Sequence, residues 1–157
     1  MSQPSEILLA LFILNLGTAF GAGIYEMRIV LPQWFIKSAQ PTYRVDTAAM
    51  READTGRKFW GFVTTLPLTL LTLANVVVAW QSVQPKHHWW LAAALITLAE
   101  RLVTFFFFIP TAIRLQNADT FPTADVSRQV SLWIGLNYIR NLLTLIAWIA
   151  ALRAFSL

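Results

Sequence analysis

Four long apolar stretches determine what this chain can fold into. They cover about residues 7–26, 59–83, 89–113 and 129–152. Each is long enough to cross a bilayer as a helix, which takes ~20 residues. A soluble helical bundle would carry a charged face on every helix, and these stretches lack one. The sequence therefore predicts an all-α, polytopic membrane protein: one domain, residues 1–157, built as a four-helix transmembrane bundle.

The charge content supports a lipid-facing surface. Only 13% of the 157 residues are charged, whereas a soluble domain has about 25%. The net charge of +4 could suggest nucleic acid, but the basic residues lie between apolar stretches and form no stripe with interleaved aromatics. We therefore expect the lipid bilayer as a partner, and no nucleic acid. The absence of cysteine excludes disulfides and thiolate metal sites.

The connection between the first two stretches is the longest. Pro32 is expected to bend or end the first helix. Residues 46–57 are expected to form a short amphipathic helix on the membrane surface, with Asp46 as its N-cap. With Trp34, this helix predicts an interfacial segment that covers one mouth of the bundle. The turn at 81–88 is short, so the second and third spans should be antiparallel neighbours.

The basic residues predict the topology. Residues 1–6 contain no Lys or Arg, so we expect the first span to be retained and not cleaved as a signal. The side with the second loop and both termini holds only Lys86 and Arg153. The first and third loops hold eight basic residues: Arg28, Lys37, Arg44, Arg51, Arg57, Lys58, Arg114 and Arg128. The positive-inside rule then places these loops in the cytoplasm and both termini outside, in a bacterial inner membrane.

Polar residues inside the spans follow the helical period. The third span has Thr97, Glu100, Arg101 and Thr104 on one face, and the fourth has Trp133, Asn137, Arg140, Asn141 and Thr144. The first span adds Asn15, Thr18, Tyr25 and Glu26. A charge at mid-bilayer costs ~2.5–3.5 kcal/mol even on a mild insertion scale. These faces should therefore turn inward, around a buried polar centre.

The buried charges balance, because two acids accompany two arginines. We expect Glu100 to pair with Arg140, directly or through one bridging atom, and Arg101 to pair with Glu26 or backbone carbonyls. Two interpretations stay open: a structural ion network that sets helix register, or a pocket for a small lipophilic molecule. For the pocket, the candidate catalytic residues are Glu100, Arg140 and Asn137. The candidate substrate-binding residues are Glu26, Arg101, Asn141, Trp133, Thr104 and Tyr25.

The sequence offers little for a metal or a cofactor. His87 and His88 are the only histidines, and they lie at a membrane face without an HxxxH or ExxH spacing. We expect solvent contact there, and neither haem nor a metal ion. Gly17 and Gly21 form a GxxxG, which favours close packing inside the bundle. A homo-oligomer stays open as an alternative.

Four segments carry a family likeness. They are Gly21-Ala22-Gly23 with the later Pro32, Phe59-Trp60 with Pro67, the turn from Pro110 to Leu115, and Trp133-x-x-x-Asn137-x-x-Arg140. Together they resemble the anthrone-oxygenase-like family of small four-span membrane proteins, most of which are described only as a domain of unknown function. The chain departs from the family pattern at Ala112, where an Asn is common.

The resemblance implies a four-helix membrane fold. It suggests oxygenation of a lipophilic aromatic or quinone-like substrate without a metal or flavin, because an anthrone carbanion can react with oxygen directly. Glu100 or Glu26 could then act as the base, with Arg140 and Asn137 stabilising the oxyanion. The competing functions are a non-catalytic module for binding or transport of a small molecule or lipid, and a structural membrane subunit.

Overall fold

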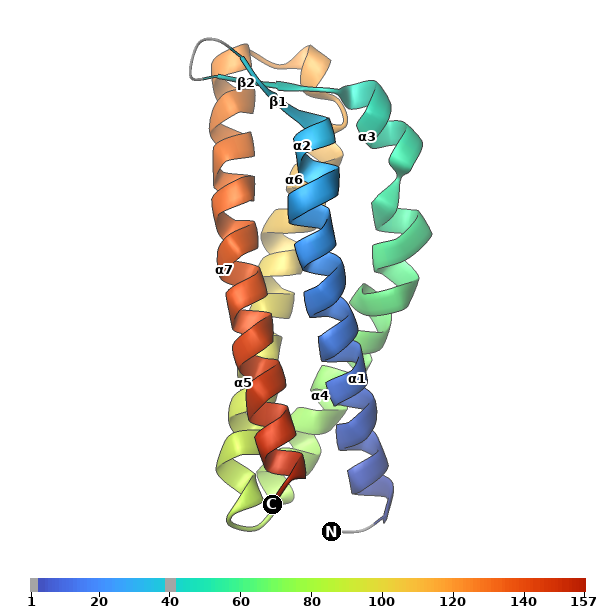
Figure 1. Ribbon diagram of the computed structural model, residues 1–157, viewed down its shortest axis with the longest axis vertical. Coiled ribbons are helices and arrows are strands. Elements are labelled where there is room, and N and C mark those ends of the chain that lie inside the picture. The colour runs from blue at the N-terminus through green and yellow to red at the C-terminus, as the bar shows by residue number, and fades with distance from the viewer. Residues whose placement is uncertain (1–2, 39–41) are drawn as a thin grey trace.

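The computed structural model describes residues 3–38 and 42–157. It contains four helices that are long and apolar enough to cross a membrane, at Gln3–Trp34, Gly56–Gln81, Lys86–Leu115 and Thr123–Phe155. Figure 1 shows them side by side along the length of the molecule. The predicted fold class is therefore confirmed, and the chain is an integral multi-pass membrane protein in contact with lipid.

Three of the spans change helix type along their length. The first consists of α1 (Gln3–Tyr25), the π-helical turn η1 (Glu26–Val30) and α2 (Leu31–Trp34); the second of the π-helix η2 (Gly56–Thr65) and α4 (Leu66–Gln81). The third consists of α5 (Lys86–Val103), the π-helical turn η3 (Thr104–Phe108) and α6 (Ile109–Leu115). The fourth is the single helix α7 (Thr123–Phe155). Each span is longer than predicted.

A proline follows every π-helical segment by two residues. Pro32, Pro67 and Pro110 each stand second in the next α-helical segment. The residue before each proline donates its N–H to the carbonyl five residues back, on Glu26, Gly61 and Thr104 respectively. A proline ring clashes with the carbonyl four residues back and donates no hydrogen bond. A wider turn accommodates it, so Pro32 does not end the first helix, which continues to Trp34.

The half of the bundle near the termini is tightly packed. There α1 packs on α4 and α7, and α5 packs on the same two helices. Gly17 lets the Trp148 ring approach α1, since a Cβ at Gly17 would lie 3.0 Å from it, whereas Gly21 faces no atom within 4 Å. The small residues of α5 and α7 at this contact are fully or almost fully buried: Ala93, Ala94, Ala147, Ala150, Ala151 and Ala154.

Tryptophans near the ends of membrane spans are commonly interfacial, and two of those in this chain are not. Trp80 and Trp89 are exposed, as residues of an aromatic belt should be. Trp90 is fully buried, and its Nε1 donates to Oδ1 of Asn75 at 2.8 Å, which connects α5 to α4. Trp60 lies inside the protein, at the site described below.

The segment between the first two spans is ordered where the structure describes it. A short antiparallel hairpin, β1 (Phe35–Lys37) and β2 (Tyr43–Val45), precedes the helix α3 (Thr47–Ala53). The sequence did not predict the hairpin. Asp46 caps α3 as expected, since its Oδ1 accepts from the N–H of Ala49 at 2.9 Å. The helix is shorter than expected, because Asp54 adopts a left-handed conformation with φ 41°.

Polar bonds fasten this segment to the third loop and α7. Thr47 and Arg51 on α3 both donate to Oδ2 of Asp119, at 2.8 and 3.1 Å, in the 3-10 turn η4 (Ala118–Thr120). The N–H of Tyr43 donates to Oγ of Ser127 on α7 at 3.1 Å. Figure 1 shows the hairpin and α3 at the end of the molecule opposite both termini. The termini therefore lie on the same side as the α4–α5 turn, as predicted.

Candidate functional site

A cavity of about 120 Å³ lies between the spans, in the half of the molecule toward the hairpin and α3. All four spans contribute to its wall, and Met50 of α3 covers one end of it. The wall includes the exposed residues Gly56 and Ile109. An engineered cavity of about 150 Å³ holds one benzene molecule. The enclosed part thus has room for about one aromatic ring.

The three π-helical segments all reach this cavity. Glu26 begins η1, Trp60 and Thr64 belong to η2, and Thr104 and Phe108 begin and end η3. π-helical turns occur often at functional sites, because they displace side chains from the regular helical pattern.

Glu26 and Arg140 form the first charged pair of the cavity wall. Oε2 of Glu26 accepts from Nη2 of Arg140 at 3.1 Å, and Oε1 accepts from Nε1 of Trp60 at 3.0 Å. The Arg140 guanidinium lies over the Phe108 ring at 4.5 Å and 5.5 Å from the Trp60 ring. Both charged side chains are largely buried, at 7% and 14% exposure. Cation–π contacts of this kind stabilise a desolvated guanidinium by up to ~2 kcal/mol.

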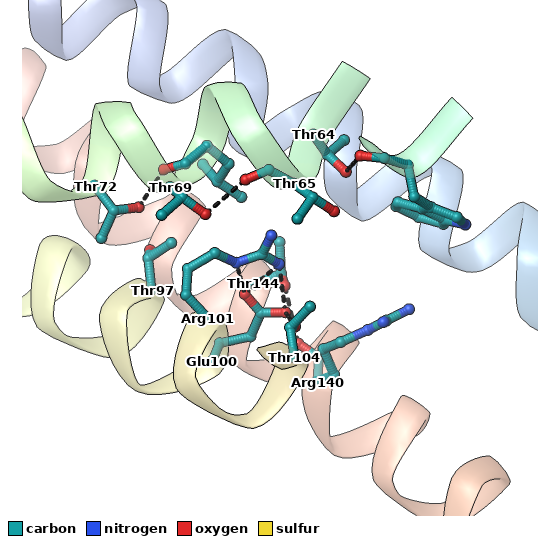
Figure 2. Close-up of polar contacts among 12 residues, drawn as sticks. Thr64, Thr65, Thr69, Thr72, Thr97, Glu100, Arg101, Thr104, Arg140 and Thr144 are labelled. Carbon is teal, nitrogen blue, oxygen red and sulfur yellow. Dashed lines mark hydrogen bonds and ion pairs between the residues drawn. The ribbon is translucent and has the colours of Figure 1, made fainter. Parts of the chain in front are cut away.

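Glu100 and Arg101 form the second pair. Nε of Arg101 donates to Oε2 of Glu100 at 2.7 Å, and Nη2 donates to Oε1 at 2.7 Å, so the contact is bidentate. Thr104, one turn along the helix, donates to Oε1 at 3.1 Å. Figure 2 shows the Arg101 guanidinium over the Glu100 carboxylate, while the Arg140 guanidinium extends away from this pair. The two pairs together leave the cavity wall without net charge.

The predicted pairing is therefore wrong. We expected Glu100 with Arg140 and Arg101 with Glu26 or backbone carbonyls, and the structure pairs Glu26 with Arg140 and Glu100 with Arg101. The expectation assumed that Glu100 and Arg101, which lie about 100° apart on one helix, would each find a partner elsewhere. The arginine side chain is long enough to bend back onto the carboxylate beside it, and the π-helical turn at Glu26 directs that carboxylate toward α7 instead.

Threonines complete the polar end of the cavity. Thr64 and Thr144 donate their hydroxyls to the carbonyls of Trp60 and Arg140, one turn back on their own helices. A hydroxyl that donates in this way keeps its oxygen lone pairs as acceptors. Figure 2 shows threonines of the second, third and fourth spans around the Arg101–Glu100 pair. The cavity thus has an aromatic part beside Arg140 and a polar part beside Arg101.

The remaining predicted site residues fall into three groups. Asn141, Trp133 and Thr104 line the cavity, as predicted for substrate-binding residues. Asn137 is fully buried one turn from Trp133, with its Nδ2 bonded to the Trp133 carbonyl at 3.0 Å, and does not appear in the cavity wall. Its Oδ1 has no hydrogen-bond partner among the described residues. Tyr25 is 61% exposed and points away from the cavity, one residue before Glu26.

The sequence missed several residues of the wall. Trp60 stands four residues before Thr64, one helical turn away on the same face, and this spacing could have revealed it. Phe108 belongs to a run of four phenylalanines, and the sequence does not show which member of that run faces the cavity. Trp34 at the end of the first span and Met50 on α3 also line the cavity, and both belong to the segment that was expected to cover one mouth of the bundle.

The two histidines lie far from this cavity, at the α4–α5 turn. Nδ1 of His87 contacts the Ala79 carbonyl at 3.0 Å, and Nε2 of His88 contacts the Gln84 amide nitrogen at 2.6 Å. Within residues 3–38 and 42–157, no three His, Asp or Glu side chains gather as metal ligands would.

Comparison with known proteins gives one family. A family model described as anthrone oxygenase matches residues 54–150, which is more than half of the chain. The matched region contains Trp60, Glu100, Arg101, Phe108, Trp133 and Arg140, and Glu26 precedes it. Neither the curated proteins nor the solved structures give a match.

Proposed function

Because the chain belongs to the anthrone oxygenase family, we propose that its cavity oxidises a lipophilic phenol, or the keto form of one, with molecular oxygen. The observation that supports this most is the position of a carboxylate, Glu26, among aromatic side chains and beside a guanidinium. The aromatic wall suits a planar ring, and the two charged groups suit removal of a proton from it.

The proposed reaction converts a ring carbon opposite the oxygen substituent into a carbonyl. A base removes a proton from this carbon, and the electron pair is delocalised onto the substituent oxygen. The carbanion gives electrons to O₂ and bonds to it, which yields a hydroperoxide after protonation. Loss of the second C–H proton and cleavage of the O–O bond release water and leave a quinone. For a CH₂ group the balance is R₂CH₂ + O₂ → R₂CO + H₂O. The substrate supplies all the electrons, so the proposal needs no redox cofactor.

Glu26 is the better candidate for the base. A carboxylate can accept about four hydrogen bonds. Glu100 accepts from Arg101 in bidentate geometry and from Thr104, whereas Glu26 accepts one bond on each oxygen. Glu26 therefore keeps more free lone pairs, and it lies nearer the aromatic part of the cavity. We assign Glu100 to holding Arg101 in place.

The charge balance also favours Glu26. Proton transfer from the substrate neutralises Glu26 and creates a substrate anion, so the net charge of the cavity is unchanged. Arg140, whose Nη2 lies 3.1 Å from Oε2 of Glu26, keeps its positive charge through this step. In a low-dielectric site it matters that the net charge stays the same, because an uncompensated buried charge costs several kcal/mol.

Oxygen uptake and quinone formation test the proposal. The purified protein in detergent micelles is given anthrone, and both quantities are followed for wild type, Glu26→Gln and Glu100→Gln. Glutamine at 26 can still accept from Trp60 but cannot take a proton, so we expect kcat to fall by roughly 10²–10⁴-fold. Glu100→Gln should retain turnover within about tenfold.

Two results would contradict this assignment. Equal turnover by wild type and Glu26→Gln would remove Glu26 as the base. Anthrone binding without any oxygen uptake by the wild type would favour a binding or transport module.

A further inference from the structure

Arg101 lines the cavity and has hydrogen-bond donors for which no acceptor is seen among the described residues. Its side chain is 8% exposed and lines the cavity. The hydrogen bonds to Glu100 use Nε and Nη2. Arginine has five N–H donors, and those of Nη1 have no acceptor among residues 3–38 and 42–157. A charged donor on a cavity wall is available for a strong hydrogen bond to an oxygen atom of a bound molecule.

The position of these donors suits an oxygen atom of the bound molecule. Figure 2 shows the Arg101 guanidinium between the Glu100 carboxylate and the threonines of the second span, so its free edge is not turned toward Glu100. The bidentate contact with Glu100 fixes the plane of the guanidinium. A donor fixed before the ligand arrives loses little conformational entropy on binding, which is a requirement for an effective oxyanion site.

The reaction proposed above calls for such a donor away from the base. When a proton leaves a ring carbon, the negative charge collects on the oxygen at the opposite side of the same ring. The group that stabilises this oxygen must therefore stand across the cavity from Glu26. Arg140 is bonded to Glu26 itself and is covered by the Phe108 ring. Arg101 lines the same cavity and belongs to the other charged pair, so it is not bonded to Glu26.

We infer that Arg101 binds the keto or phenolate oxygen of the substrate and stabilises the charge that develops on it. This inference rests on the proposed function. It assigns Arg101 the role of oxyanion stabiliser that the sequence had suggested for Arg140. It also narrows the substrate class, because a ring without an oxygen opposite the oxidised carbon would leave Nη1 of Arg101 unpaired.

A matched pair of ligands tests this without turnover. Anthrone and 9,10-dihydroanthracene have the same carbon skeleton, and only anthrone has the oxygen. Their dissociation constants are measured in the absence of O₂ by quenching of tryptophan fluorescence. The wild type should bind anthrone roughly 10- to 100-fold more tightly, as expected for a hydrogen bond to a charged group. Arg101→Lys keeps the charge beside Glu100 but loses the planar set of guanidinium N–H donors. Its preference for anthrone over 9,10-dihydroanthracene should therefore fall below about threefold.

Arg140→Lys is the control, and it should keep the preference. The infrared band of the anthrone carbonyl gives a second measurement that needs no substitution at 101. We expect it to shift to lower frequency in the wild-type and Arg140→Lys complexes. An unshifted band in the wild-type complex, equal binding of both ligands, or loss of the preference in Arg140→Lys alone would overturn the inference. Since no O₂ is present, a failure of Glu26 as the base would leave this result unaffected.

Discussion

The side-chain amide of Asn15 on α1 donates to the backbone carbonyl of Val63 on η2 at 3.0 Å. In a regular α-helix this carbonyl would accept from residue 67, which is a proline and has no N–H. The first span thus supplies the donor that Pro67 cannot supply. This bond joins two spans at the level where the helix type changes.

Replacing Asn15 by Leu should destabilise the protein by ~1–3 kcal/mol, because it removes a hydrogen bond between two spans in an apolar environment. Thr18→Val is the control on the same helix, since Thr18 is exposed and donates only to its own helix, at Leu14. Thermal unfolding in detergent measures both. Equal melting temperatures for the two variants would show that the Asn15 bond contributes nothing.

Gly23 and Gly21 offer a matched pair on α1. A Cβ at Gly23 would collide with the side-chain amide of Asn141, whereas a Cβ at Gly21 would meet nothing within 4 Å. Gly23→Ala should therefore destabilise by ~1–3 kcal/mol through overpacking. Gly21→Ala should be neutral or stabilising by ~0.5–1 kcal/mol, because alanine is the better helix former. The two melting curves, recorded side by side, decide this, and a tolerated Gly23→Ala would contradict the close contact with Asn141.

Trp90 and Trp89 are neighbours with different environments. Trp90→Phe removes the donor to Oδ1 of Asn75, which is fully buried, and should cost ~1–3 kcal/mol. Trp89 is 47% exposed, so Trp89→Phe should change stability by less than ~0.5 kcal/mol. Denaturation in mixed micelles can compare the two. The prediction fails if Trp89→Phe proves as harmful as Trp90→Phe.

Arg140 should tolerate lysine better than alanine. Arg140→Ala leaves the Glu26 carboxylate buried with Trp60 as its remaining donor, and removal of one member of a buried pair costs ~3–5 kcal/mol. Arg140→Lys keeps the charge and should keep the fold. Expression level and melting temperature report the difference; an Arg140→Ala protein as stable as wild type would mean that the pair is not structurally required.

Topology can be tested because the chain has no cysteine. Ser38→Cys lies at the hairpin end of the molecule, and Ser156→Cys lies at the end with the α4–α5 turn. Membrane-impermeant maleimide should label these two from opposite sides. We expect Ser156→Cys to react from outside an intact bacterial cell and Ser38→Cys only after lysis, in line with the positive-inside rule. The reverse pattern would invert the proposed orientation.

The four spans and their inward polar faces could be predicted because both depend on simple periodic signals. Each span exceeds the length a bilayer requires, and Glu100, Thr104, Asn141 and Thr144 fall on faces that the helical period defines. Asp46 as an N-cap predicted where α3 begins. Each of these features depends on residues close together in the chain, so a single sequence is enough to predict it.

The ion pairs could not be predicted for a physical reason. Two acids and two arginines can be neutralised in more than one way, and the sequence does not rank the pairings. The choice depends on where Glu26 points, which the π-helical turn η1 determines. Tyr25 illustrates the same difficulty. It precedes Glu26 by one residue, about 100° away around the helix, so only one of the two could face the cavity.

The short π-helical turns have a consequence for how this chain tolerates change in length. One such turn behaves as a single-residue insertion: it adds a residue without adding a turn. Everything beyond η1 or η3 is therefore rotated by about 100° relative to an uninterrupted helix. Deleting one residue from η1 would shorten the first span very little, but it would turn Trp34 away from the cavity together with the start of the hairpin. In these spans, adding or removing one residue changes the direction of the side chains that follow more than it changes the length of the span.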